Sequence, residues 1–349
     1  MRFAVRVPTS NKVASRAAIV DVAQAAEALG FYAVSLHDHL VFNGWWVACG
    51  AREAAGAGDD RDMYEALVTL SYVAGKTERV KLMTAILLLP TRETVLMAKQ
   101  VATLDVLAEG RVILGVGIGP QVERGEHGAT SPEAHLSGHA SNALKEYDTF
   151  RVPRQRGRMA DEQLAAMRAI WTQDVASFDG QFVQFHAIEV FPKPVQPGGP
   201  PIWVGGRSRA ALRRVLLHGN AWHPNVLTPQ QYGEGVAALR QMAADLGRPA
   251  PTDWGLNVFS CVAASDDEAM ALFGPEMGER FPGDVLRSRN LVGSPETVVR
   301  RLQEFQAAGL NVVELKPIYR SVPDLIRMLE LIAREVMPAL QTEPTPARA

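Results

Sequence analysis

Three short polar groups, each following an apolar run, contain residue types that could do chemistry. The groups are His37-Asp38-His39, Gly117-Ile118-Gly119 and Gly205-Gly206-Arg207-Ser208. A histidine beside a carboxylate holds and releases protons near neutral pH. Glycines let a backbone approach a flat ring closely. A helix that starts just after glycines presents unpaired N–H groups to an anion, and Arg207 adds positive charge there.

Each group also has an ordinary structural explanation. A lone histidine near a strand end often bonds a neighbouring loop carbonyl. A short Gly-x-Gly is common in loops. The segment from Gly205 to Ser208 can be a simple turn in which Ser208 caps the next helix. The choice between the two interpretations depends on whether the fold brings the three groups together.

Eight short apolar runs alternate along the chain with segments of helical spacing. The runs are Phe3–Val7, Tyr32–Leu36, Val80–Leu89, Val112–Val116, Ile202–Val204, Ala221–His223, Leu256–Ala263 and Val312–Leu315. Near-continuous apolar strands separated by helices indicate a buried parallel sheet. We therefore predict an α/β fold, a (β/α)₈ TIM barrel, with residues 1–349 as one domain. An open doubly wound sheet is the alternative, but no GxGxxG follows the first strand.

Three insertions interrupt the repeat, at about residues 43–60, 122–142 and 175–200. The first two follow the second and fourth strands, so we expect them at the C-terminal face of the barrel as lids or pocket walls. Trp45 and Trp46 would form an aromatic wall or cover a dimer contact. The third insertion contains a hairpin, 177–185, with its turn predicted at Asp179-Gly180.

The histidines of the second insertion, His127, His135 and His139, invite a metal interpretation because positions 135 and 139 suit one helix face. The segment is rich in Gly, Ser and Pro, however, and no HExxH is present. We predict no metal site and a mobile lid instead.

Composition excludes several classes of function. The chain has 349 residues, 47% hydrophobic and 21% charged, with a formal charge of -2 and no long basic run, which argues against nucleic-acid binding. Cys49 and Cys261 lie too far apart in sequence for a CxxC motif, which favours a reducing cytoplasm. No apolar run is long enough for a membrane span, and no signal peptide is evident.

Several blocks of sequence resemble the luciferase-like monooxygenase superfamily, and within it the deazaflavin (F420)-dependent oxidoreductases. They are EALGFYAVSLHDHL, TERVKLMTAILLLPTRETVLMAKQVATLDVLAEGRVILGVGIG, PKPVQPGGPPIWVGGRSRAALRRV with the following AWHP, and LVGSPETVVRRLQEFQAAGLN. The resemblance implies a bacterial-luciferase-like barrel. It also implies FMN or coenzyme F420, with the ring across the ends of strands two to five.

The resemblance implies roles for individual residues. It makes His39 and Asp38 the catalytic pair, with His39 facing the ring and Asp38 at its polar edge. It places a bulge at Thr84-Ala85-Ile86, with a cis peptide between the last two, behind the ring. Gly117, Ile118 and Gly119 would lie against the ring. Gly205, Gly206, Arg207 and Ser208 would hold the cofactor's phosphate-bearing tail.

The substrate side is less well defined by the resemblance. Sugar-phosphate dehydrogenases of the family place a proton-donating Glu where this chain has Pro120, so that substrate and mechanism are not expected here. Glu123 is the nearest candidate polar group. His223 is expected to line the substrate pocket together with Trp45 and Trp46.

Three functions follow as hypotheses. The first is an oxidoreductase that transfers hydride between F420 and a small organic substrate. The second is an FMN-dependent monooxygenase that uses reduced flavin and O₂. The third is a non-enzymatic barrel that binds a ligand or a light-reactive flavin. Relatives often form dimers, so a homodimer is expected.

Overall fold

The computed structural model describes residues 1–41, 61–120, 145–277 and 284–340. Several predicted site residues lie outside these ranges, and their assignments remain predictions: Trp45, Trp46, Glu123, His127, His135 and His139.

Eight parallel strands close into a barrel, as predicted. Their hydrogen-bonded order is β1-β2-β3-β4-β7-β8-β9-β11, and pairing of β11 with β1 and of β8 with β9 closes the cylinder. The strands are β1 (Arg2–Arg6), β2 (Ala33–Leu36), β3 (Lys81–Leu88), β4 (Val112–Gly117), β7 (Ile202–Val204), β8 (Ala221–Trp222), β9 (Asp253–Val262) and β11 (Val312–Pro317). Each overlaps one of the eight predicted runs, because buried parallel strands are apolar on both faces.

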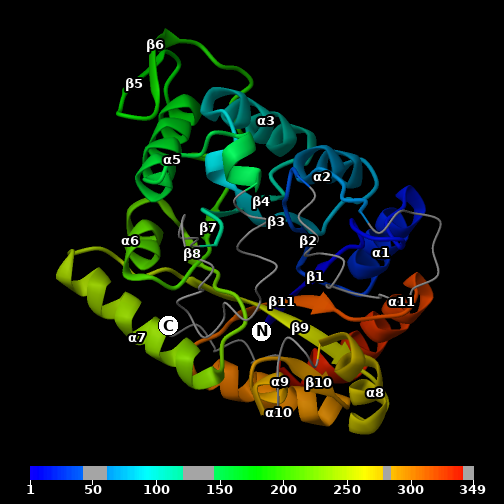
Figure 1. Cartoon of the computed structure of the whole chain (residues 1–349). Helices are drawn as coiled ribbons and strands as arrows, with labels where there is room; N and C mark the ends of the chain where they lie inside the picture. Colours follow the sequence, from blue (N-terminus) through cyan, green and yellow to red (C-terminus); the bar gives the residue numbers. More distant parts are fainter. Residues whose placement is uncertain (42–60, 121–144, 278–283, 341–349) are drawn as a thin grey trace, which may run out of the picture.

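Helices surround the strands (Figure 1). They are α1 (Arg16–Ala28), α2 (Ala66–Ala74), α3 (Thr94–Leu107), α5 (Arg156–Thr172), α6 (Arg209–His218), α7 (Pro229–Asp245), α8 (Asp266–Met277), α9 (Asp284–Ser288), α10 (Pro295–Ala307) and α11 (Val322–Leu331), with short helical turns at Leu89–Thr91, Ile332–Val336 and Pro338–Leu340. Serine N-caps begin α1, α6, α10 and α11, each accepting a backbone N–H. Ser208 is one of them, so its cap role is established.

Two regions differ from the sequence prediction. Between β9 and β11 the chain adds α8, α9 and the short strand β10 (Leu291–Gly293), which pairs with β9. The hairpin of β5 (Ala176–Asp179) and β6 (Gln184–Ile188) exists, but its turn is longer than predicted. Asp179 still pairs with Gln184, and the turn begins at Gly180. Since this hairpin connects the end of α5 to the start of β7, it lies toward the N-terminal ends of the strands, away from the barrel mouth.

The interior of the barrel is layered because alternate residues of each strand point inward. The lower layer is an apolar cluster whose largest member, Trp203, is fully buried. It is surrounded by smaller side chains from the other strands: Ala4, Ala33, Met83, Ala85, Ile113, Ala221 and Val312. Two residues further along β1, β2 and β11 the inward residues are polar, namely Arg6, Ser35 and Glu314. Apolar side chains therefore fill the lower part of the barrel, and the next layer toward its C-terminal end consists of polar side chains.

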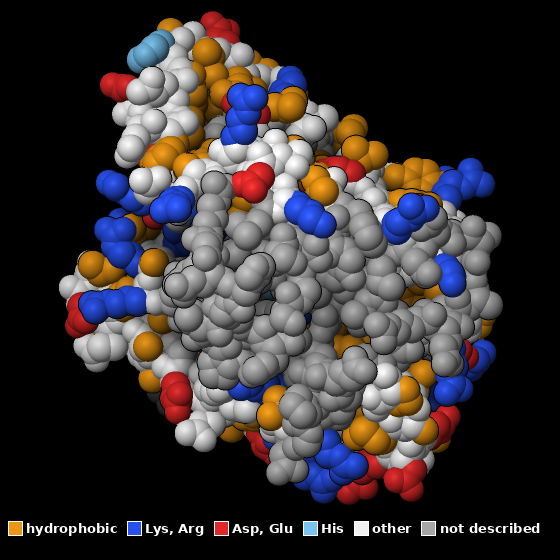
Figure 2. Space-filling view, viewed as in Figure 1, with side chains coloured by type: hydrophobic (Ala, Val, Ile, Leu, Met, Phe, Trp, Pro, Cys, Tyr) orange, Lys and Arg blue, Asp and Glu red, His pale blue; other side chains and the backbone are white. Residues whose placement is uncertain are grey.

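The surface carries mixed charge on the face seen in Figure 2, where Lys and Arg side chains lie scattered among acidic and apolar ones. In the part of the chain that the structure describes, no helix combines the length and apolar character needed to cross a bilayer.

Candidate active site

The polar layer is centred on Glu314 of β11, which is fully buried. One of its oxygens accepts hydrogen bonds from Ser35 Oγ (2.6 Å) and Arg6 Nη2 (3.1 Å). The other accepts from His223 Nε2 at 2.8 Å and from Asn257 Nδ2. The donors come from β1, β2, β9 and the end of β8. A single carboxylate thus ties four parts of the barrel together.

Electrostatics favour the ionised form of this carboxylate. Burial alone would raise the pKa of Glu314, but Arg6 and the hydrogen bonds from His223 and Ser35 outweigh it and lower the pKa to about 2. Glu314 is therefore an anion throughout the physiological range. Its charge holds Arg6 in place inside the barrel.

Arg6 also reaches the predicted bulge in β3. Its Nη2 donates to the carbonyl oxygen of Ala85 at 2.9 Å. The Ala85–Ile86 peptide is cis, and the pairing of β3 with β4 shifts register between Thr84 and Leu87. Thr84 Oγ1 closes the other side of the bulge by donating to Gly115 O at 2.7 Å. Both the bulge and the cis bond are where the sequence resemblance implied.

Two glycines of β4 and the glycine that follows β7 make room for this bulge. A Cβ on Gly117 would lie 2.0 Å from Cδ1 of Ile86, and one on Gly205 would lie 2.7 Å from the same atom. A Cβ on Gly115 would lie 1.9 Å from the carbonyl oxygen of Thr84. A side chain at Gly115 would require the backbone of the bulge to move, and one at Gly117 or Gly205 would require at least the Ile86 side chain to move. The glycine motifs therefore have a packing reason, whatever ligand they face.

Tyr147 and Arg156 fix the loop that follows β4. Tyr147 Oη lies within hydrogen-bonding distance of Ile118 O (3.2 Å) and Pro120 O (3.1 Å). Arg156 donates to the same two carbonyls. Gly119 has φ +71°, and a Cβ there would lie 1.9 Å from Tyr147 Oη. The half-buried Ile118 side chain packs against the main core. Contact of this loop with a cofactor ring stays a prediction.

Asp38 is buried and serves as a brace. One carboxylate oxygen accepts from Arg92 Nη2 at 2.6 Å and the other from the Leu88 amide at 2.9 Å. Arg92 also pairs with Glu65 at 2.9 Å. Although burial would lower the pKa of Arg92, these two carboxylates raise it. Both oxygens of Asp38 thus accept hydrogen bonds from within the protein, and they fix the end of β3. Contact of Asp38 with a cofactor ring stays a prediction.

His39 is paired with a residue far away in sequence. Its Nδ1 lies 2.9 Å from Oε2 of Glu146, a buried carboxylate in the helical turn at residues 145–149. The second oxygen of Glu146 accepts from the Leu40 amide at 2.5 Å. A carboxylate that accepts at Nδ1 fixes the tautomer and orientation of an imidazole. His39 therefore lies near the barrel mouth with its ring held in one orientation.

The loop from β7 to α6 begins buried and becomes exposed. Gly205 N donates to Val116 O at 2.9 Å, and Gly206 (φ +94°) accepts at its carbonyl from Trp222 Nε1 at 2.8 Å. Residues 206–210 are exposed at the start of α6. Arg207 lies at this helix N-terminus, and Arg289 is close enough for its charge to act on Arg207. Burial and that charge lower the pKa of Arg207. Such a concentration of positive potential suits an anion.

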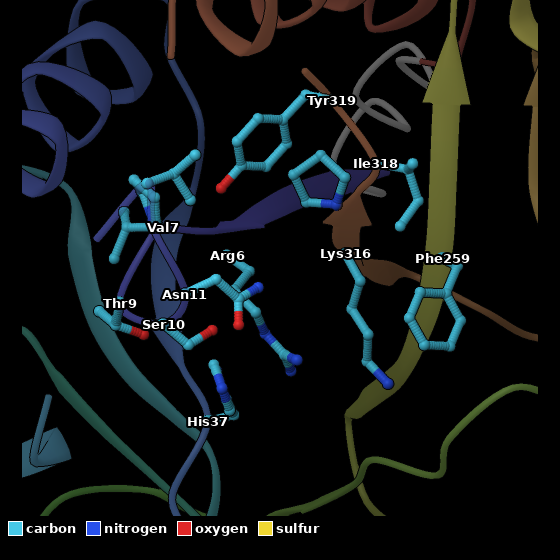
Figure 3. Close-up of a pocket in the computed structure, with 13 residues that line it drawn as sticks. Arg6, Val7, Thr9, Ser10, Asn11, His37, Phe259, Lys316, Ile318 and Tyr319 are labelled. Carbon is cyan, nitrogen blue, oxygen red and sulfur yellow. The ribbon is translucent and has the colours of Figure 1, made fainter. Parts of the chain in front are cut away.

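A cavity opens at the mouth beside this polar layer (Figure 3). It lies at the C-terminal ends of β1, β2, β9 and β11, with about 510 Å³ of empty space including the part open to solvent. Figure 3 shows Arg6, His37 and Lys316 directed toward a common space. Lys316 donates to Asn225 Oδ1 at 2.7 Å, and its ammonium lies 4.6 Å from the centre of the Phe259 ring.

His223 and His37 lie differently with respect to this cavity. His223, predicted to line the substrate pocket, is 2% exposed, bonded to Glu314 and packed against Trp203, and it is not among the residues lining this cavity. His37 does line the cavity. Burial, followed by the positive charges of Arg6, His39 and Lys316, lowers its pKa well below the usual value, so His37 is neutral at pH 7. Sequence reasoning passed over His37 in favour of its neighbours.

The chain belongs to the luciferase-like monooxygenase family, whose model matches residues 1–279. It is 29% identical over 326 residues to an FMNH(2)-dependent dimethylsulfone monooxygenase of Pseudomonas putida, covering 80% of this chain and 83% of that protein. It is 32% identical over 195 residues to an uncharacterised protein of Mycobacterium tuberculosis, a match that spans 54% of this chain and only 60% of that relative.

A solved structure of a different relative shares the fold. The coenzyme F420 dependent tetrahydromethanopterin reductase of Methanopyrus kandleri superposes with a TM-score of 0.75 at 17% identity, over 97% of this chain and 99% of that one. Proteins similar to this chain thus include both FMN-dependent and F420-dependent enzymes. The chain is thus a member of a family whose proteins use either of these cofactors.

Proposed function

We propose that this protein transfers a hydride between coenzyme F420 and a small organic substrate at the mouth of its barrel. The observation that carries the proposal is the Ala85–Ile86 bulge. It is held by Arg6 through the Ala85 carbonyl, while the glycines of β4 and Gly205 after β7 pack against it without side chains. This combination gives a rigid, small-residue wall next to a cavity rich in hydrogen-bond donors, which suits a flat ring with a polar edge.

The residues present fit such a cofactor at two points. In the cavity that Arg6 shares with the bulge through its bond to Ala85, the buried Nδ1 of His37 has no partner within the described residues, and Arg6 and Lys316 supply positive charge. About the start of α6, the exposed N-terminus with Arg207 and nearby Arg289 suits a phosphate-bearing tail. FMN and F420 both have such a tail, so this feature supports a flavin or deazaflavin in general. Preference for F420 rests on the sequence blocks PPIWVGGRSRAALRR and AWHP.

F420, when bound, supplies two electrons as a hydride from a ring carbon. The chain supplies position and charge. Arg6 fixes the bulge, and Asp38 with Arg92 fixes the end of β3 from behind. We assign His39, oriented at Nδ1 by Glu146, to hold a proton beside the ring. Lys316 and Arg6 stabilise negative charge at the cavity. The predicted homodimer remains part of this proposal.

An FMN-dependent monooxygenase is the second candidate, favoured by the similarity to the FMNH(2)-dependent enzyme of Pseudomonas putida. In that case the same wall would face reduced flavin, and the cavity would hold the substrate that receives oxygen. Oxygen consumption with reduced FMN, coupled to product formation, would be its signature.

Titration of the purified protein with F420 and with FMN, followed by visible absorption, separates the two. We expect tighter binding of F420. Arg207→Ala should weaken binding of either cofactor roughly tenfold, since a charge-assisted hydrogen bond to phosphate is lost. Arg213→Ala, an exposed arginine on the same helix, is the matched control and should change nothing. Tighter binding of FMN together with turnover of reduced FMN and O₂ would replace the first proposal with the second.

A further inference from the structure

One helical turn carries two consecutive side chains, Glu146 and Tyr147, that bond the loops following β2 and β4. Glu146 is fully buried, and its two oxygens bond the Leu40 amide at 2.5 Å and His39 Nδ1 at 2.9 Å. Tyr147 is 5% exposed, and its Oη lies 3.2 Å from the carbonyl oxygen of Ile118. In the barrel β3 lies between β2 and β4, so the turn connects two parts of the mouth that do not pair with each other.

The turn is attached to α5 as well as to the two loops. Val152 N donates to Tyr147 O at 2.8 Å, and the two side chains form a small buried cluster. Arg156, the first residue of α5, has its guanidinium carbon 5.1 Å from the centre of the Tyr147 ring. Because α5 packs against α3 and α6, the turn has a fixed position on the barrel. Its two side chains therefore hold the two loops at a set distance from each other.

The bond to Glu146 determines which nitrogen of His39 can exchange a proton. A carboxylate only accepts hydrogen bonds, and one Glu146 oxygen already accepts from the Leu40 amide. Nδ1 of His39 must therefore donate to the other oxygen, which fixes a proton on Nδ1. Nε2 is then the nitrogen through which His39 gains or loses a proton.

The hydroxyl of Tyr147 fixes the backbone of the other loop. It lies within hydrogen-bonding distance of the carbonyl oxygens of Ile118 and Pro120. Gly119, between them, has no side chain, and a Cβ there would lie 1.9 Å from Tyr147 Oη. Three consecutive residues of the loop thus pack on one hydroxyl group. Loss of that hydroxyl would free the segment that is predicted to lie against the cofactor ring.

We propose that Glu146 and Tyr147 are positioning residues of the active site. Glu146 places the exchangeable proton of His39 at Nε2, and Tyr147 holds the backbone of residues 118–120. One turn thereby sets the spacing between the group that holds the proton and the loop beside the ring. As roles in hydride transfer, these assignments rest on the proposed function. The tautomer of His39 and the order of the loop do not depend on it, and both can be measured without a cofactor.

NMR of the full chain with nitrogen-15 in its histidine rings tests the role of Glu146, at about pH 8, where histidine is ordinarily neutral. The His39 signals are assigned with His39→Gln. We expect a proton on Nδ1 in wild type. In Glu146→Gln we expect the proton on Nε2, because the amide nitrogen of glutamine donates where the carboxylate accepted. Lys145→Gln is the matched control, since it also removes one charge from this turn, at an exposed position, and should leave the tautomer unchanged.

A purely structural Glu146 would leave the tautomer of His39 the same in Glu146→Gln, and that result would overturn the assignment. So would a wild-type spectrum without a proton on Nδ1, which decides the question even if Glu146→Gln does not fold.

Tyr147→Phe tests the second role, because it removes the hydroxyl and keeps the packing of the ring. We expect faster amide hydrogen exchange in residues 117–120, unchanged exchange in residues 37–41, and F420 binding weaker by roughly 2- to 10-fold. Val152→Ala, which loosens the base of the turn, should speed exchange in both segments. Val175→Ala, at an exposed valine, should speed it in neither. Wild-type exchange in Tyr147→Phe, or a rise in only one segment in Val152→Ala, would overturn the role of the turn.

The two proposals fail in different ways. A protein that binds neither F420 nor FMN, yet shows the expected tautomer and exchange, would overturn the proposed function and keep the geometry assigned to the turn. F420 binding that is tight in wild type and unchanged in Tyr147→Phe would overturn the role of Tyr147 and keep the proposed function.

Discussion

The two halves of the barrel mouth are built from opposite kinds of residue. On β3, β4 and β7 the inner surface is made of glycines and the side chain of Ile86, so backbone and one apolar residue define it. On β1, β2, β9 and β11 it includes large charged side chains, those of Arg6 and Lys316, together with apolar ones such as Phe259. Arg6 is the link, because it binds Glu314 on one side and the Ala85 carbonyl on the other.

If the proposed function holds, this difference lets one fold separate two tasks. A flat ring needs a rigid surface without protruding side chains, and glycines provide it only if something fixes the backbone. A polar substrate needs donors and charge, which are costly to bury unless they are paired. The charged half contributes to both, because the Arg6 that pairs with buried Glu314 also bonds the Ala85 carbonyl and so fixes the backbone of the glycine half.

The largest expected effect is that of breaking the buried ion pair between Arg6 and Glu314. Glu314→Gln leaves Arg6 buried without a counter-charge, so we expect the free energy of unfolding to fall by about 3–5 kcal/mol. Denaturant unfolding measures it, and the double variant with Arg6→Met should recover part of the loss. A change of less than about 1 kcal/mol in the single variant would contradict the role given to this network.

The same variant has a pH signature. The pKa of Glu314 is lowered from its usual range to about 2 in the folded protein, so its stabilising contribution is complete above the unfolded value and disappears as pH falls toward 2. Wild-type protein should lose this contribution on acidification between about pH 4.5 and pH 2. Glu314→Gln should show a shallower loss of stability over that interval.

Next comes the glycine half. In Gly117→Ala the new methyl group would meet Ile86 Cδ1 at 2.0 Å, so Ile86 or the bulge must move. We expect a loss of about 1–3 kcal/mol of stability together with weaker cofactor binding, and partial rescue when Ile86→Val is added. Gly75→Ala is the control, since its nearest neighbour would be at 3.7 Å. Wild-type cofactor affinity in Gly117→Ala would separate the bulge from the cofactor site.

The smallest effect concerns His37 and depends on pH. Because its pKa is lowered well below the unfolded value, the folded protein favours neutral His37 and loses stability as pH falls below about 6.5. From pH 7 to pH 5, wild type should lose more stability than His37→Asn, as measured by urea unfolding at each pH. Parallel pH curves for the two proteins would show that His37 is not held neutral in the fold.

Much of the fold follows from the sequence alone. All eight barrel strands were predictable from apolar runs, because a strand covered by helices outside and packed inside is mostly apolar on both faces, with few polar residues such as Arg6 and Glu314. The segment of α8, α9 and β10 was not predicted. It contains Gly274 and Pro275 within α8 and interrupts the regular alternation. The long hairpin turn was missed because Asp179-Gly180 matches a tight two-residue turn, whereas the strands pair through Asp179.

The site was predictable only in part. Position at strand ends and the family resemblance located Asp38, the bulge and the glycines. The pairing of His39 with Glu146 spans 107 residues, and that of Arg6 with Glu314 spans 308, so neither is visible before the barrel closes. One local signal was available: Arg6 in FAVRVP and Glu314 in VVELKP each stand inside an apolar strand. A charge in such a place must find a partner.

A crystal structure of the protein with F420 tests the central claim most directly. We predict the ring against the Ala85–Ile86 bulge, with the phosphate-bearing tail at residues 205–208 beside Arg207 and the Arg6–Lys316 cavity next to the ring. Density for F420 outside the barrel mouth, or a ring turned away from the bulge with the tail remote from α6, would contradict it.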